Sequence, residues 1–129
     1  MICANPDFVS PAKPGKETTF QPGHLARRFE ELGGRVLYFG KPEKEHFEAC
    51  VRMLGMDRAR IAHVGDSMNR DVVGACGARV PVVFVAGGIE HRSLNIVPGE
   101  SPSPESLEAL FARFGVRPTY IVNLASWSE

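Results

Sequence analysis

Apolar residues recur at helical spacing in three stretches of the chain. Residues 23–32 and 43–54 place Leu, Phe, Val or Ala three or four positions apart, which predicts one apolar face on each of two amphipathic helices. Glycine follows both stretches, as is common where a helix ends. A third apolar stripe follows Ser103 and Pro104, which are residues that favour the start of a helix. A shorter helix is expected over residues 69–76.

Short apolar runs lie between these predicted helices. Residues 36–39, 61–64 and 80–85 are rich in strand-forming side chains and are followed by glycines, which predicts strands buried within a sheet. Residues 119–124 are a candidate for one further strand. Because helices and apolar strands alternate, we expect an α/β fold with a Rossmann-like parallel sheet. Ligands of such sheets bind beyond the carboxyl ends of the strands.

The first residues of the chain have a different pattern. A short apolar segment, residues 1–4, leads directly into a stretch over residues 6–22 that is rich in Pro, Gly, Ser, Thr and Lys and is expected to be a loop. A strand with no lead-in suggests a chain that begins within a larger fold. Residues 90–104 are expected to form a long surface loop.

Composition and charge narrow the class of protein. The chain has 129 residues, of which 43% are hydrophobic and 23% are charged, as is typical of a soluble globular domain. Lys plus Arg equals Asp plus Glu at 15 each, so nothing suggests a nucleic-acid or membrane partner. The three cysteines contain no Cys-x-x-Cys pair, which argues against structural zinc and favours a reducing, cytoplasmic location. No signal peptide and no apolar run of transmembrane length is visible.

Polar residues of a particular kind follow two of the predicted strands. Lys41 follows the run over residues 36–39, and Asp66 and Asp71 follow the run over residues 61–64. If these strands are parallel neighbours, the three side chains converge on one rim. Carboxylates suit Mg²⁺, which takes few protein ligands and shares phosphate oxygens, and a lysine supplies a compact positive charge. Phosphoryl transfer needs little more than such positioning and charge neutralisation.

Each candidate residue also has a purely structural interpretation. Lys41 could be a solvated loop lysine, Asp66 could cap the following helix, and Asp71 could be a solvated acid in its first turn. The sequence from Asn5 to Asp7, with a proline between them, favours a turn even without any function. In the predicted strand over residues 61–64, the histidine is expected to be a core residue with a hydrogen bond.

The order and spacing of these motifs resemble the haloacid-dehalogenase superfamily. Gly65-Asp66 with Asp71 after a strand, Gly40-Lys41-Pro42 upstream of it, and the segment over residues 3–7 before both carry the resemblance. The match covers about residues 3–94. It is similar to the NagD-like branch, which includes sugar-phosphate, nucleotide, pyridoxal-phosphate and phosphoglycolate phosphatases.

The resemblance implies Mg²⁺-dependent hydrolysis of a phosphate monoester, with a small phosphorylated metabolite as substrate. Lys41 would contact the phosphoryl group, Asp66 would ligate Mg²⁺, and Asp71 would ligate it or orient its water. Asn5 and Asp7 would belong to the tail of a cap domain. Residues 1–34 are then expected to be that tail with a connecting helix, and residues 35–129 the C-terminal part of the core.

The chain departs from the family in one large respect. Such enzymes use an aspartate nucleophile in an Asp-x-Asp-Gly segment, and no Asp-x-Asp occurs in this sequence. We therefore expect a partial chain of such a phosphatase, inactive by itself, which associates with a missing N-terminal half or with a second copy. The alternative is a non-catalytic module, derived from this fold, that binds a metal or phosphate or serves in assembly.

Overall fold

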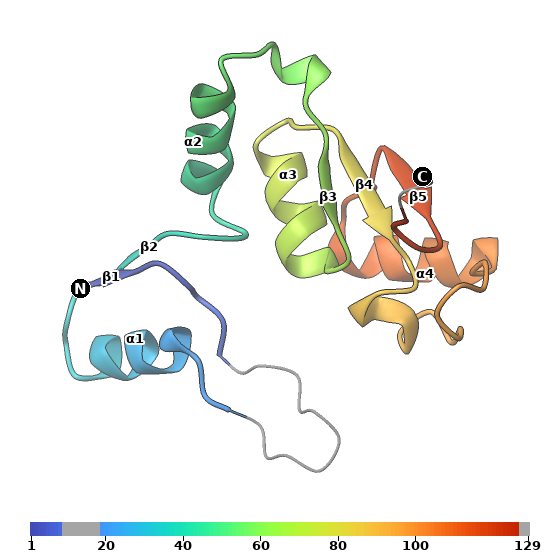
Figure 1. The fold of residues 1–129 in the computed structure, drawn as a ribbon. Helices are drawn as coiled ribbons and strands as arrows, with labels where there is room; N and C mark the ends of the chain where they lie inside the picture. The colour runs from blue at the N-terminus through green and yellow to red at the C-terminus, as the bar shows by residue number, and fades with distance from the viewer. Residues whose placement is uncertain (9–18, 127–129) are drawn as a thin grey trace.

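The computed structural model describes residues 1–8 and 19–126. The loop expected over residues 6–22 therefore lies partly outside the described residues. The described part of the chain is an α/β arrangement in which every strand pairing is parallel (Figure 1). This confirms the predicted fold class.

The strands form two small sheets. In the first sheet, Ile2 lies opposite Leu37, and in the second, Val64 lies opposite Val83, which lies opposite Tyr120. The first sheet contains β1 (Ile2–Cys3) and β2 (Leu37–Tyr38), and the second has the order β3 (His63–Gly65), β4 (Val82–Val85) and β5 (Tyr120–Val122).

The α-helices of the described residues lie close to where the hydrophobic pattern predicts them. They are α1 (Pro22–Glu31), α2 (Lys44–Leu54), α3 (Val73–Gly77) and α4 (Pro104–Phe114). Gly55 ends α2 and Gly115 ends α4, both with positive φ, which glycine adopts at low cost. The helix expected over residues 69–76 begins as a π-helical turn, Met68–Val72, that continues into α3.

One hydrophobic core joins the second sheet to α2, α3 and α4. Phe84 of β4 is fully buried and meets Phe111 of α4 edge to face, with ring centroids 6.5 Å apart. Phe47 of α2 packs on the backbone of Gly74 in α3, where an added Cβ would lie 2.4 Å from its ring. The core therefore lies on the side of the sheet that Phe84 faces, and it sets the position of the turn after β3.

The expectation of fully buried strands is only partly met. Leu37 of β2 is 63% exposed and Val64 of β3 is 55% exposed. Their apolar character agrees with strands covered on both faces, but the described residues cover mainly one face of the second sheet. Among the described strands, β2 pairs only with β1, so it is not the hydrogen-bonded neighbour of β3.

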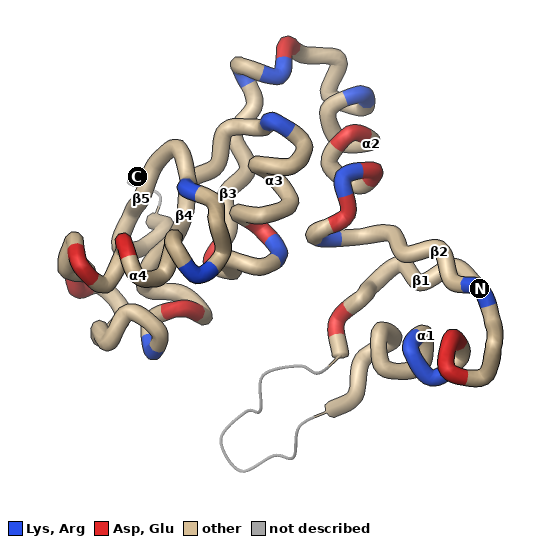
Figure 2. The backbone as a smooth tube through the Cα atoms, turned by 180° about the vertical axis from the view of Figure 1, so that it is seen from behind, with Lys and Arg blue, Asp and Glu red and all other residues tan. Residues whose placement is uncertain are grey.

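Charged residues are spread along the described chain with both signs interspersed (Figure 2). No helix of the described residues is long and apolar enough to cross a membrane.

Candidate functional site

Lys41 lies in the loop that joins β2 to α2. Gly40 has a φ of 123°, and a Cβ there would lie 2.8 Å from the carbonyl oxygen of Ala4, so glycine alone fits this turn. Lys41 follows at once, and its Nζ lies 2.7 Å from Oδ1 of Asp71. The premise that β2 and β3 are neighbouring strands is not met, but the loop still brings Lys41 to the turn after β3.

Asp71 is the most enclosed charged residue near this turn, at 2% exposed. Its Oδ2 accepts the backbone N–H of Ser67 at 3.0 Å, and its Oδ1 lies 2.9 Å from Nε2 of His63 in addition to Lys41. Gly65 makes room for this carboxylate, because a Cβ at Gly65 would lie 2.2 Å from Cγ of Asp71. Three segments of the chain therefore hold one buried carboxylate.

The surroundings of Asp71 favour its charged form. Burial acts to raise the pKa of this carboxyl, but hydrogen bonds from His63, Lys41 and Ser67 outweigh burial, so the pKa lies well below its ordinary value. Asp71 is therefore ionised throughout the physiological pH range. The interpretation of Asp71 as a solvated acid in a first helical turn is wrong.

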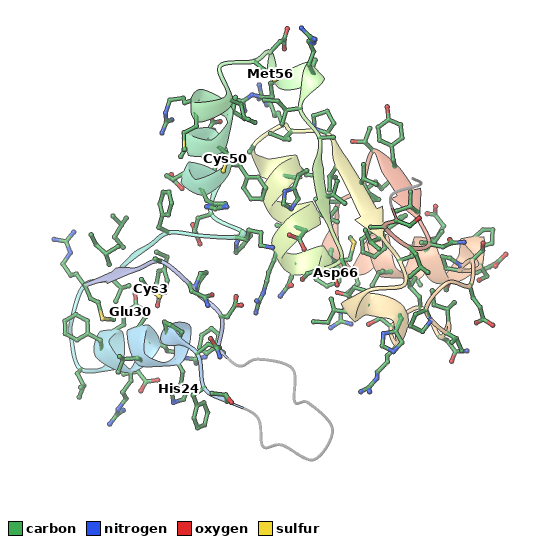
Figure 3. All side chains as sticks on the ribbon, in the orientation of Figure 1. Cys3, His24, Glu30, Cys50, Met56 and Asp66 are labelled. Atoms are coloured by element: carbon green, nitrogen blue, oxygen red, sulfur yellow. The ribbon has the colours of Figure 1, made fainter. Side chains whose placement is uncertain are left out.

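Asp66 lies at the end of β3, beside the segment that follows β4 (Figure 3). Its Oδ2 accepts the backbone N–H of Ile89 at 3.0 Å. Gly88 allows this approach, because a Cβ there would lie 2.2 Å from Cβ of Asp66. Asp66 thus ties the loop after β4 to the turn after β3, and no side-chain hydrogen bond caps the helical turn that begins at Met68.

The donor set fits only part of a magnesium site. Among residues 1–8 and 19–126, no group of three or more His, Cys, Asp or Glu is arranged to hold a metal ion. Mg²⁺ usually takes one or two protein carboxylates, with waters and phosphate oxygens completing its shell. Asp66 suits such a role, since its Oδ1 accepts no hydrogen bond from the described residues. Asp71 has both oxygens engaged and suits the anchoring of Lys41 better.

Asn5 and Asp7 lie near this region but differ in what they contact. The backbone N–H of Asp7 donates to Oδ1 of Asn5 at 3.1 Å, so Asn5 shapes the predicted turn. The Asp7 carboxylate forms an ion pair with Arg70, the residue before Asp71. A hollow of about 300 Å³ is lined by Asp7, Lys41 and Arg70 among others. Asp7 therefore lines the hollow beside Lys41, whereas Asn5 is not among the residues that line it.

Two contacts of this region were not predicted. The expected hydrogen bond of His63 is confirmed, but its partner, Asp71, lies across a turn whose geometry no periodicity encodes. No pattern in the sequence points to Arg70, because its partner Asp7 is distant in sequence and only the folded chain joins them.

The fold and these residues define an α/β protein with a lysine and carboxylates gathered around the turn after β3. The HAD-hydrolase-like family model matches residues 38–123, more than half of the chain. The chain belongs to the HAD-hydrolase-like family. This confirms the predicted superfamily.

Solved structures agree with the family. The chain is 26% identical to a p-nitrophenyl phosphatase from Archaeoglobus fulgidus, with a TM-score of 0.67 over 95% of this chain and 42% of that one. A haloacid dehalogenase-like hydrolase from Brucella suis 1330 is 30% identical, with a TM-score of 0.61 over 94% of this chain and 42% of that one. A 4-nitrophenylphosphatase from Thermotoga maritima shares the fold at 24% identity, with a TM-score of 0.63 over 94% of this chain and 40% of that one.

The phosphatases among these matches agree with the NagD-like branch. The chain spans less than half the length of these relatives. Among curated proteins, none matches it in sequence.

Proposed function

We propose that this chain carries the lysine and carboxylate part of a phosphate-monoester hydrolase, with Mg²⁺ as cofactor and a small phosphorylated metabolite as substrate. The observation that carries the proposal is the 2.7 Å ion pair between Lys41 and the buried Asp71. The fixed Asp71 carboxylate holds the Lys41 ammonium in the loop after β2, and the ammonium still has N–H donors that Asp71 does not use. The matched family and the phosphatases among the solved structures support the same reaction class.

Lys41 is the group we assign to the phosphoryl oxygens. An ammonium has three donors, and Asp71 uses one of them, which leaves two for a ligand. The Lys41 side chain is 42% exposed, so those donors are within reach of solvent and of a ligand. Neutralising charge on the transferring group is the largest contribution that a protein makes to phosphoryl transfer.

Asp66 is the residue we assign to Mg²⁺, whereas Asp71, whose two oxygens are both engaged, holds Lys41 beside that site. The metal, when bound, would add charge neutralisation to that of Lys41. With one carboxylate oxygen available on Asp66 and no group of three or more potential ligands arranged to hold a metal in the described residues, we expect only weak affinity for Mg²⁺.

Binding is tested by NMR titration of the chain with Mg²⁺ and with orthophosphate. Lys41→Ala should weaken phosphate binding and Asp66→Asn should weaken Mg²⁺ binding. Two exposed residues of α2 give matched controls, Lys44→Ala for the lysine and Glu45→Gln for the carboxylate, and neither should change affinity. Tight Mg²⁺ binding that survives loss of both Asp66 and Asp71 would contradict the assignment.

Catalysis is tested with p-nitrophenyl phosphate in the presence of Mg²⁺. We expect no turnover by the chain alone, because a covalent route needs a nucleophile and no Asp-x-Asp segment is present in the sequence. Robust hydrolysis that Lys41→Ala abolishes would reveal a nucleophile elsewhere in the chain.

The missing Asp-x-Asp segment also favours a second candidate function, a non-catalytic module that binds a metal or phosphate. The coding DNA upstream of Met1 separates the two. An in-frame Asp-x-Asp-Gly segment there supports the enzyme, whereas its absence supports the module.

A further inference from the structure

His63 contacts the carboxylate that holds Lys41, and it comes from a different element. It begins β3, whereas Lys41 lies in the loop before α2 and Ser67 in the turn after β3. We infer that His63 is a positioning residue, which fixes the Asp71 carboxylate and through it places the Lys41 ammonium for a phosphate ligand. The inference rests on the proposed function, since it names a determinant of the same phosphate site.

The ring of His63 packs against Phe47 and is restrained by it. Phe47 meets it edge to face, with ring centroids 5.1 Å apart and an interplanar angle of 77°. Phe47 is buried and seats on Gly74, so it has little freedom to move away. On the neighbouring strand β4, Val82 pairs with His63 and is buried. Paired residues of adjacent strands point to the same face, so both side chains lie on the core side of the sheet. The ring therefore has one orientation, with Nε2 directed at Asp71.

The hydrogen bond between His63 and Asp71 can have only one donor. An ionised carboxylate accepts and never donates, so Nε2 of His63 carries the proton and donates to Oδ1 of Asp71. The same oxygen accepts Lys41, and Oδ2 accepts the N–H of Ser67. With donors on both oxygens, the plane of the carboxylate is fixed.

Lys41 depends on that fixed plane. Its flexible stem is partly exposed, and Asp71 is the one ion-pair partner of its ammonium among the described residues. Without His63, the only donor on Oδ1 would be the flexible Lys41 itself, so the backbone N–H of Ser67 on Oδ2 would be the only fixed donor left and the carboxylate could turn about its Cβ–Cγ bond. The ammonium would then sample several positions, and a phosphate ligand would have to order it.

Two substitutions in the full chain separate positioning from packing. His63→Leu keeps an apolar contact for Phe47 but removes the donor, whereas His63→Gln supplies an amide N–H of similar reach. NMR relaxation of the Lys41 Cε group reports the order of the ammonium, and titration with orthophosphate reports affinity. We expect His63→Leu to mobilise Lys41 and to weaken phosphate binding about tenfold, the size of one hydrogen bond to a charged group. His63→Gln should restore both.

The outcomes are distinct. A folded His63→Leu chain with a rigid Lys41 and unchanged affinity overturns the inference. So does a folded His63→Gln chain that behaves like His63→Leu, because packing alone would then explain His63. If the unmodified chain binds no phosphate, the proposed function fails, while Lys41 order in the two variants still decides the role of His63.

Discussion

Asp71 shows how glycines can determine a charged site. The carboxylate lies against Gly65, and the neighbouring Asp66 lies against Gly88, each at a distance that no Cβ would tolerate. These two glycines leave room for carboxylates that then receive backbone N–H groups. The Gly-Asp pair in this turn is therefore needed for space as well as for chemistry.

Gly65→Ala tests this requirement. The new methyl group would lie 2.2 Å from Cγ of Asp71, so the carboxylate must move. We expect a loss of about 1–3 kcal/mol in the free energy of unfolding, as for other overpacked sites. Urea unfolding measures it. Gly77→Ala in α3 is the matched control, because nothing lies within 4 Å of its Cβ position, and it should leave stability unchanged or slightly raised. Equal effects of the two changes would contradict the steric argument.

The charge of Asp71 predicts a pH dependence of stability. Its pKa is lowered in the folded chain, so its contribution is complete above the ordinary carboxyl pKa of about 4 and is lost as pH falls below that value. Asp71→Asn should destabilise the chain by about 2 kcal/mol at neutral pH. Urea unfolding from neutral pH to about pH 3 should show a shallower acid decline in this variant than in the unmodified chain.

Glu108 provides the control for that experiment. It pairs with Arg117 on the surface, where both side chains are exposed. Glu108→Gln should cost well under about 1 kcal/mol, as is usual for exposed pairs. An acid decline that stays unchanged in Asp71→Asn would show that other carboxylates determine it.

At the residue scale, the sequence predicts the groups but not all of their partners. The sequence predicts that Lys41 and Asp71 meet, because each comes shortly after a strand-like run, but those two runs lie in different sheets and the loop after β2 brings Lys41 to Asp71. The spacing of residues in the sequence does not predict the ion pair of Asp7 with Arg70. That pair forms because the segment with Asp7, which is distant in sequence, lies against the turn after β3 in the folded chain. Contacts of that kind depend on the fold as a whole.

Helix α4 shows how much a local signal can determine at the scale of an element. Ser103 was predicted to begin it, and its Oγ accepts the backbone N–H of Ser106 at 3.2 Å. Ser103→Ala should cost about 1 kcal/mol of stability, whereas Ser103→Asp keeps an acceptor there and should cost little. Thermal unfolding compares the two. A Ser103→Ala chain as stable as the unmodified one would mean that packing alone determines where α4 begins.

Strand partners are less predictable than helix boundaries. The prediction of a strand over residues 36–39 is confirmed by β2, but Leu37 is exposed where burial is expected, and the condition that this strand lies next to β3 is not met. Helix signals are local, because capping residues and periodicity act over a few positions. The pairing of β2 with β1 depends on a contact between distant segments, and an apolar run contains no information about its partner.

At the scale of the whole molecule, the second sheet has an open face. Val64, Val83 and Tyr120 lie side by side across β3, β4 and β5, on the face opposite Val82 and Phe84. The edge of β3 away from β4 has no partner among the described strands. Parallel sheets are normally covered on both faces, and an apolar open edge favours pairing with another chain.

We therefore propose that the chain associates through this face and edge, with a second copy or with a polypeptide that supplies the rest of the core. Light scattering should show growth in mass with concentration, and addition of an N-terminal half in trans should raise solubility. Val64→Lys should shift the distribution towards monomer, because it places a charge on the open face. Val97→Lys is the control, since Val97 is also exposed but lies in the loop before α4. A monodisperse, cooperatively folded monomer of the unmodified chain would contradict this proposal and would favour an independent module over part of an enzyme.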